Sequence, residues 1–149
     1  MFRYILISLT LALTLSFWTT GEAQIEGAVI ERSNLFDGQW VNDRNSAVTF
    51  AEHDGLLTGF YQTALGQPET STKFLLTGFV EGDQITFTVN FKGYGSLTSW
   101  TGQLTEDASG KPYIRTLWNL TRDVLDEDEQ DDMWNSITSG ASDFSRVGN

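Results

Sequence analysis

The chain of 149 residues contains no cysteine and a single histidine. The absence of cysteine excludes disulfide bonds, so stability must come from the core, with oligomerisation as a further source. Basic residues are scarce, because nine Lys and Arg against twenty Asp and Glu give a formal net charge of -11. That balance argues against nucleic acid and anionic membrane surfaces as partners, since both call for a basic patch. The length predicts one domain with a real core.

Only one long apolar run is present, and it lies at the N-terminus. Arg3 precedes an apolar segment from Ile5 to Trp18, and Gly21-Glu-Ala23 has the small-x-small pattern of a cleavage site. The run holds several hydroxyl residues and is short for a membrane span, so a secretory signal peptide over residues 1–23 is preferred to an anchor. We expect cleavage near Ala23 and a secreted, extracellular or periplasmic protein. A loose arm over residues 24–34 and one domain over residues 35–149 should follow.

Helix-period segments of useful length are lacking too. Instead, short apolar alternations separated by turn residues recur from Leu35 onward, the rhythm of a sandwich or barrel. Because the connections are short, neighbouring strands should pair antiparallel. Strands are predicted at Phe36–Asn42, Ser46–Glu52, Leu56–Ala64, Phe74–Glu81, Gln84–Lys92, Leu97–Thr105, Tyr113–Thr121 and Ile137–Val147. The predicted fold class is all-β, an eight-stranded antiparallel up-and-down β-barrel whose interior can hold one small ligand.

Two connections are longer than turns. Residues 65–72 are polar with Gly and Pro, and this segment could fold over a barrel mouth as a lid. Residues 122–133 carry the acidic run Asp126-Glu-Asp-Glu-Gln-Asp-Asp132. The run suggests calcium, but it lacks the ligand spacing and the turn glycine of a known calcium loop. A solvated loop is therefore preferred, and no metal site is predicted.

Catalytic residues are equally few. His53 lies beside Asp54-Gly55 in a predicted hairpin turn, where a general base would have neither a nucleophile nor a pocket. No paired carboxylates fall on the inward faces of the strands, and no glycine-rich phosphate loop opens a helix. The protein is therefore predicted not to be an enzyme. Asn119-Leu-Thr121 matches a glycosylation sequon, but it lies inside a predicted strand and carries little weight.

The stretch from Ser96 to Trp100 indicates what the interior holds instead. Counting by two, Ser96, Thr98 and Trp100 share one face, which combines two hydroxyls with an indole. Such a surface suits a ligand that is part ring and part polar. The same mixture recurs at Asn42, Ser46, Tyr61, Thr63, Leu65, Phe87, Val89, Phe91, Thr116, Trp118 and Leu120. The alternative, in which the rings only fill a core and the hydroxyls face outward, is weaker because one parity repeats over five strands.

Six blocks follow one another along the chain with spacing typical of one family. They are Gly38-Gln-Trp40-Val-Asn42…Ser46, Gly55-Leu-Leu-Thr-Gly-Phe-Tyr61-Gln-Thr63-Ala, Thr88-Val-Asn-Phe-Lys92, Ser96-Leu-Thr-Ser-Trp-Thr-Gly-Gln103, Ile114-Arg-Thr-Leu-Trp118-Asn-Leu120 and Gly140…Phe144. In these blocks the chain resembles the avidin/streptavidin family of biotin-binding proteins, from Leu35 to Val147. The resemblance implies non-catalytic, high-affinity binding of biotin at a barrel end, sequestering free biotin, with no cofactor.

The resemblance also implies roles for the matching residues. Asn42, Ser46 and Tyr61 would donate to the ureido oxygen of biotin, and Thr63 would accept from one ureido N–H. Trp134 looks like the Trp that tetrameric members lend to a neighbouring subunit's site, which favours a homotetramer over a dimer. The remaining matches are Ser96 and the Gln67 backbone near the valerate carboxylate, Thr98 at the ring sulfur, and the apolar walls Phe91, Trp100, Trp118, Leu65 and Leu120.

Two positions depart from the family pattern. The position that usually holds Asp or Asn, which accepts from the second ureido N–H, falls on Ser142. A neutral hydroxyl there loses a charge-assisted bond, of order 1 kcal/mol or more, unless a bulge turns Asp143 inward. Phe91 stands where many members have Trp, so a ring is kept with less contact area. An alternative is therefore the same barrel binding a different small heterocyclic or lipophilic ligand.

Overall fold

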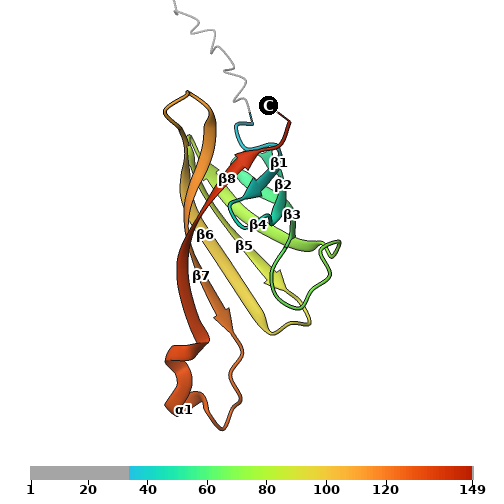
Figure 1. The fold of residues 1–149 in the computed structure, drawn as a ribbon, viewed down its shortest axis with the longest axis vertical. Helices are drawn as coiled ribbons and strands as arrows, with labels where there is room; N and C mark the ends of the chain where they lie inside the picture. Colours follow the sequence, from blue (N-terminus) through green and yellow to red (C-terminus); the bar gives the residue numbers. More distant parts are fainter. Residues whose placement is uncertain (1–33, 149) are drawn as a thin grey trace, which may run out of the picture. The chain divides into compact units, whose positions relative to one another are not determined.

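The computed structural model describes residues 34–148. The predicted signal peptide and residues 24–33 of the predicted arm lie outside the described residues. Within this range the chain forms a closed barrel in which each strand pairs antiparallel with the next and β1 pairs with β8 (Figure 1). The strands are β1 (Gly38–Asn42), β2 (Ala47–His53), β3 (Leu56–Gln62), β4 (Phe74–Glu81), β5 (Gln84–Phe91), β6 (Ser96–Glu106), β7 (Pro112–Arg122) and β8 (Ile137–Arg146). The predicted eight-stranded up-and-down barrel is confirmed.

Alternation of buried and exposed residues is what fixes each strand in the wall of the barrel. In β4 and β5 every second side chain is buried, from Phe74 to Val80 and from Ile85 to Phe91. Since neighbouring side chains of a strand point to opposite faces, this pattern turns one apolar row inward on each strand. The register of β4 on β5, with Leu76 opposite Val89, keeps both rows on the same face.

The core inside the barrel is mainly aromatic. Phe87 stacks on Trp100 with ring centroids 4.9 Å apart and an interplanar angle of 8°. Phe50 and Phe144 approach Phe87 edge-on, at 5.0 Å and 6.0 Å. Trp40 is fully buried, and its indole N–H donates to the Phe36 carbonyl oxygen over 2.8 Å. These ring contacts form a continuous aromatic cluster around Phe87 inside the barrel.

The connection between β7 and β8 contains two short helical segments that the sequence pattern did not predict. They are α1 (Glu129–Asp132) and η1 (Met133–Ser136), and Figure 1 shows the α1 segment beyond the ends of β7 and β8. Acidic residues occupy the first turn of α1, where they interact favourably with the positive end of the helix. A single turn of helix is too short to give a detectable period in the sequence. Across residues 34–148, no helix is long and apolar enough to cross a membrane.

Candidate ligand-binding site

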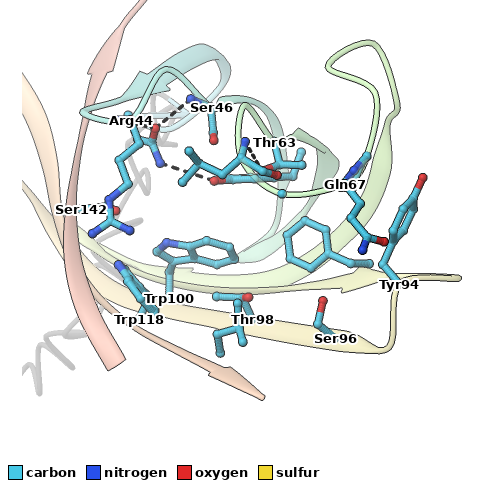
Figure 2. A pocket seen from close by; sticks show the side chains of 17 residues that line it. Arg44, Ser46, Thr63, Gln67, Tyr94, Ser96, Thr98, Trp100, Trp118 and Ser142 are labelled. Atoms are coloured by element: carbon cyan, nitrogen blue, oxygen red, sulfur yellow. Dashed lines mark hydrogen bonds between the residues drawn. The ribbon is translucent and has the colours of Figure 1, made fainter. Parts of the chain in front are cut away.

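One end of the barrel holds a cavity of about 330 Å³, which is within the range of small-molecule sites. Figure 2 shows Arg44 and Ser142 on one side of it and Gln67, Tyr94 and Ser96 on the other. The structure brings together at this cavity every residue to which the family resemblance gave a binding role except Trp134. Phe87, Val89 and Thr116 also point inward as predicted, but they are buried in the core and do not line the cavity. The lining residues are Asn42, Arg44, Ser46, Tyr61, Thr63, Leu65, Gly66, Gln67, Pro68, Phe91, Tyr94, Ser96, Thr98, Trp100, Trp118, Leu120 and Ser142.

The tight turn after β1 fixes the orientation of Asn42. The Asn42 side-chain oxygen accepts from the backbone N–H of Arg44 at 3.0 Å and of Ser46 at 2.8 Å. Asn45 adopts a positive φ of 63° in this turn, a conformation that Asn tolerates well. Because the oxygen is already used, the Asn42 amide must point its NH₂ group at the cavity, where it lies 3.4 Å from the Tyr61 hydroxyl.

The hydroxyl of Ser46 is oriented in the same way. Its oxygen accepts from the backbone N–H of Ala64 at 3.0 Å. This bond joins the residue before β2 to the segment after β3. Ser46 is almost completely buried. With the oxygen partly engaged, its proton is available to donate to a ligand oxygen or to a neighbour.

Tyr61 is held in the interior by aromatic contacts. Its ring lies 5.9 Å from Phe91, edge-on, and 5.1 Å from Trp100. Burial raises the pKa of the Tyr61 phenol above its ordinary value, although hydrogen bonds with Ser46 and Asn42 and the positive charge of Arg44 oppose the rise. The phenol therefore stays protonated at neutral pH and can donate. We refer to Asn42, Ser46, Tyr61 and Thr63 as the Tyr61 side of the pocket.

The loop after β3 begins with a turn built on Thr63. The Thr63 hydroxyl oxygen accepts from the Leu65 backbone N–H over 3.0 Å, and the hydroxyl donates to the Leu65 carbonyl oxygen over 3.0 Å. This local ring of bonds presents Leu65, Gly66, Gln67 and Pro68 to the cavity. Residues 65–68, the first half of the segment that was expected to act as a lid, therefore line the cavity.

Trp118 forms a wall of the pocket, and a glycine in β8 makes room for it. Gly140 pairs with Trp118 in the register of β7 on β8. A Cβ atom at position 140 would lie 2.4 Å from Trp118 Cζ2, far inside van der Waals contact. Any other residue at position 140 would therefore displace the indole or the strand.

Ser142 faces the cavity through a regular strand, without a bulge. It pairs with Thr116, whose hydroxyl donates to the Ser142 carbonyl oxygen over 2.7 Å. Asp143 faces outward and forms an ion pair with Arg115 over 3.5 Å. A bulge that would turn Asp143 inward is therefore absent. The neutral Ser142 hydroxyl occupies the position where the family usually has Asp or Asn. We refer to Arg44, the Trp100 indole N–H and Ser142 as the Ser142 side.

Two side chains at the cavity were not foreseen. Arg44 and Tyr94 both sit in segments that the sequence marked only as turns, between β1 and β2 and between β5 and β6. Tyr94 packs edge-on against Phe74 at 5.8 Å. The available signal was position, since both turns adjoin predicted lining residues at the same barrel end. Gly66 and Pro68 line the cavity in the same way, within the predicted lid segment.

Trp134 lies outside the pocket of its own chain. It belongs to η1 and is 89% exposed. The predicted solvated character of the acidic run agrees with the exposure of Asp126, Glu127 and Asp128. Between residues 34 and 148, no group of three or more His, Cys, Asp or Glu could hold a metal ion.

The fold and the pocket define an eight-stranded β-barrel with a cavity of small-molecule size at one end. Comparison with protein-family models matches residues 31–147 to the avidin family. Avidin from Gallus gallus is 33% identical over 122 residues, which are 74% of this chain and 76% of avidin. Avidin-related protein 4/5 from Gallus gallus is 30% identical over 132 residues, covering 84% and 86% of the two chains.

Solved structures agree with these relatives. Xenavidin superposes with a TM-score of 0.66 at 29% identity, covering 78% of this chain and 100% of that chain. A biotin-binding protein from chicken superposes with a TM-score of 0.67 at 29% identity, covering 78% and 99%. The chain belongs to the avidin family. The family consists of binding proteins without catalytic activity or cofactor, so the protein is not an enzyme.

Proposed function

We propose that the protein binds biotin in the cavity at the barrel end and thereby sequesters free biotin. The observation that carries this proposal is the set of oriented donors on the Tyr61 side facing the aromatic walls. Asn42, Ser46 and Tyr61 together offer an amide and two hydroxyls to one ligand oxygen, the arrangement that the ureido oxygen of biotin needs. Phe91, Trp100 and Trp118 supply apolar surface for the fused rings and the valerate chain.

Calorimetric titration with biotin tests the proposal directly. The chain beginning at Gln24 should release heat on binding and saturate at one biotin per chain. Tryptophan fluorescence should change as well, because Trp100 and Trp118 line the cavity. Absence of heat, together with failure to compete with a labelled biotin probe, would overturn the assignment of biotin.

The second candidate is a different small heterocyclic or lipophilic ligand in the same cavity. The observation that favours it is the Ser142 side, where no carboxylate or amide is present to accept a second ureido N–H. A heterocycle that binds while biotin fails would establish this alternative.

We further propose a homotetramer, in which Trp134 enters the pocket of a neighbouring subunit. Its near-complete exposure supports this role, since a large indole gains much from burial at an interface. On the outer face of the barrel, Leu56 pairs with Phe79 and Phe60 with Leu75, and all of these side chains are exposed. Adjacent exposed apolar residues of this kind mark association surfaces.

The assembly is tested by light scattering on the purified protein with and without biotin. The proposal is supported if the wild type forms a four-chain particle and the Trp134→Ala variant binds biotin more weakly. A two-chain particle with unchanged affinity in Trp134→Ala would refute it.

We also propose a secreted, extracellular or periplasmic location, because residues 1–23 are predicted to form a signal peptide. Detection of a mature chain that starts at Gln24 would test this proposal.

A further inference from the structure

Arg44 gives the cavity a charge that contrasts with the rest of the chain. All cavity-lining residues lie within the described range, and Arg44 is the only charged one among them. The whole chain carries a net charge of -11, so this local positive charge is opposite in sign to the protein average. A ligand entering the cavity therefore meets a cation and no carboxylate.

The Arg44 side chain is positioned over the pocket wall. Its guanidinium carbon lies 5.3 Å from the centroid of the Trp118 ring, a distance that allows a cation–π interaction. Within residues 34–148, no carboxylate lies within ion-pair distance of this guanidinium. Among the described residues its charge is therefore not compensated by an ion pair, although the Asp43 carboxylate acts on the Tyr61 phenol with the opposite sign and a smaller effect. Figure 2 shows the guanidinium beside Ser142, above Trp118.

A second observation indicates that the same corner has fewer acceptors than donors. Trp100 is 5% exposed, and its indole N–H is buried without a hydrogen-bond partner in the described structure. In Figure 2 the Trp100 ring nitrogen is turned toward the side where Arg44 and Ser142 lie. Buried donors are normally paired, so an unpaired one marks a place where an acceptor is missing. The Ser142 hydroxyl is the one side chain of the Ser142 side that is able to accept.

We propose that Arg44 is a specificity-determining residue, and that the pocket prefers ring heads whose edge facing Arg44 and Ser142 carries an acceptor atom or a negative charge. Heads with a positive charge are disfavoured. Among neutral heads, one with an N–H at that edge, such as the ureido ring of biotin, should bind less tightly than a matched ring with an acceptor there. This inference rests on the proposed function, because it takes the Tyr61 side as the site of the ring carbonyl. It also specifies which atom the ring should carry at the edge facing Arg44 and Ser142, a feature that the description as a cyclic urea does not include.

The first test compares biotin with iminobiotin, its cyclic guanidine analogue, which is cationic at neutral pH. Arg44→Gln should raise the affinity for iminobiotin relative to biotin by about five- to tenfold, the effect of one unit charge at this range in a partly solvated site. Arg44→Lys should keep the wild-type ratio, and the difference should shrink as salt is added. Lys111→Gln removes the same charge from an exposed turn residue outside the cavity and should leave the ratio unchanged.

The second test uses two small rings that differ in one position. 2-Oxazolidinone has a ring oxygen where 2-imidazolidinone has an N–H, and both keep the carbonyl oxygen. Competition followed by tryptophan fluorescence should show the oxazolidinone binding the wild type more tightly. That preference should fall severalfold in Arg44→Gln.

The outcomes separate the two proposals. If biotin binds and Arg44→Gln changes neither ratio, the inference is wrong while biotin binding stands. If biotin fails but the oxazolidinone binds in an Arg44-dependent manner, the proposed function is wrong while the acceptor preference stands. If no ring binds the wild type, both are wrong.

Discussion

The two sides of the pocket differ in how completely their polar groups are paired. On the Tyr61 side, the acceptor atoms of Asn42, Ser46 and Thr63 are engaged by backbone N–H groups of the adjoining turns. On the Ser142 side, the Trp100 N–H has no partner among the described residues and Arg44 has no described counter-ion. The Tyr61 side is therefore oriented before a ligand arrives, whereas the Ser142 side depends on the ligand to supply an acceptor.

This difference indicates which side should supply affinity and which should supply selectivity. Groups fixed in advance lose little conformational freedom on binding, so the Tyr61 side should supply most of the binding free energy. Groups without partners discriminate among ligands, because a wrong ligand leaves them unpaired. Substitutions on the Tyr61 side should therefore mainly change affinity, and substitutions on the Ser142 side should mainly change selectivity.

The largest loss of biotin affinity is expected when a donor on the Tyr61 side and the Trp118 wall are removed together. Tyr61→Phe removes a buried donor and Trp118→Ala removes a ring, so the double variant should lose biotin affinity by about a thousandfold or more. Calorimetry or competition with a labelled probe measures this loss. Tyr113→Phe is the control, because Tyr113 lies on β7 outside the cavity. Unchanged affinity in a folded double variant would mean that the ligand site has been misplaced.

A smaller loss is expected from Gly140→Ala, which disturbs the Trp118 wall without altering a polar group. The added methyl would lie 2.4 Å from the Trp118 ring, so overpacking should lower the free energy of unfolding by about 1–3 kcal/mol. Biotin affinity should fall about tenfold as the indole moves. Both quantities are measured by thermal unfolding and calorimetry.

A double-mutant cycle identifies the cause of the Gly140→Ala effect. The benzene ring of the indole makes the clash, through Cζ2, Cε2 and Cη2. Gly140→Ala should therefore cost much less stability in a Trp118→Phe background, where that part of the side chain is absent. Equal costs in both backgrounds would show that the glycine is needed for a different reason.

A gain is expected when the Ser142 side receives an acceptor. Ser142→Asp should raise biotin affinity by about five- to tenfold, since a carboxylate can accept a charge-assisted bond from the second ureido N–H. The positive charge of Arg44 at the same corner should help to keep that carboxylate ionised. Ser145→Asp places the same charge on the outward face of β8 and should change little. A loss of affinity in Ser142→Asp would show that the corner is filled rather than short of an acceptor.

The sequence could predict most of the barrel because the two-residue alternation of apolar and polar residues matches the alternation of buried and exposed side chains in the strands. Phe74–Glu81 was predicted with its observed bounds, since alternate apolar residues are bounded by clear turn signals on both sides. The inward parity of Ser96, Thr98 and Trp100 likewise placed all three at the cavity. These positions follow from local geometry that the sequence records directly.

Residues in connections could not be placed by the same argument. Arg44 lies in a turn, where no period says whether a long side chain extends over the pocket or into solvent. Its position depends on the Asn42-centred turn and on the Trp118 ring from β7, which is distant in sequence. The one-turn helix at Glu129–Asp132 was missed for a related reason, because four residues cannot establish a helical period.

The smallest effect concerns the protonation of the Tyr61 side. Burial raises the pKa of Tyr61 above its value of about 10 in the unfolded chain, so the folded state favours the protonated phenol. This stability is fully present below about pH 10 and is lost as the pH rises through the raised pKa, because the unfolded chain ionises first. Wild-type Tm should therefore fall more steeply above pH 10 than the Tm of Tyr61→Phe. Biotin affinity should decline over the same interval, since a phenolate cannot donate to the ureido oxygen, and parallel Tm profiles for the two proteins would contradict this account.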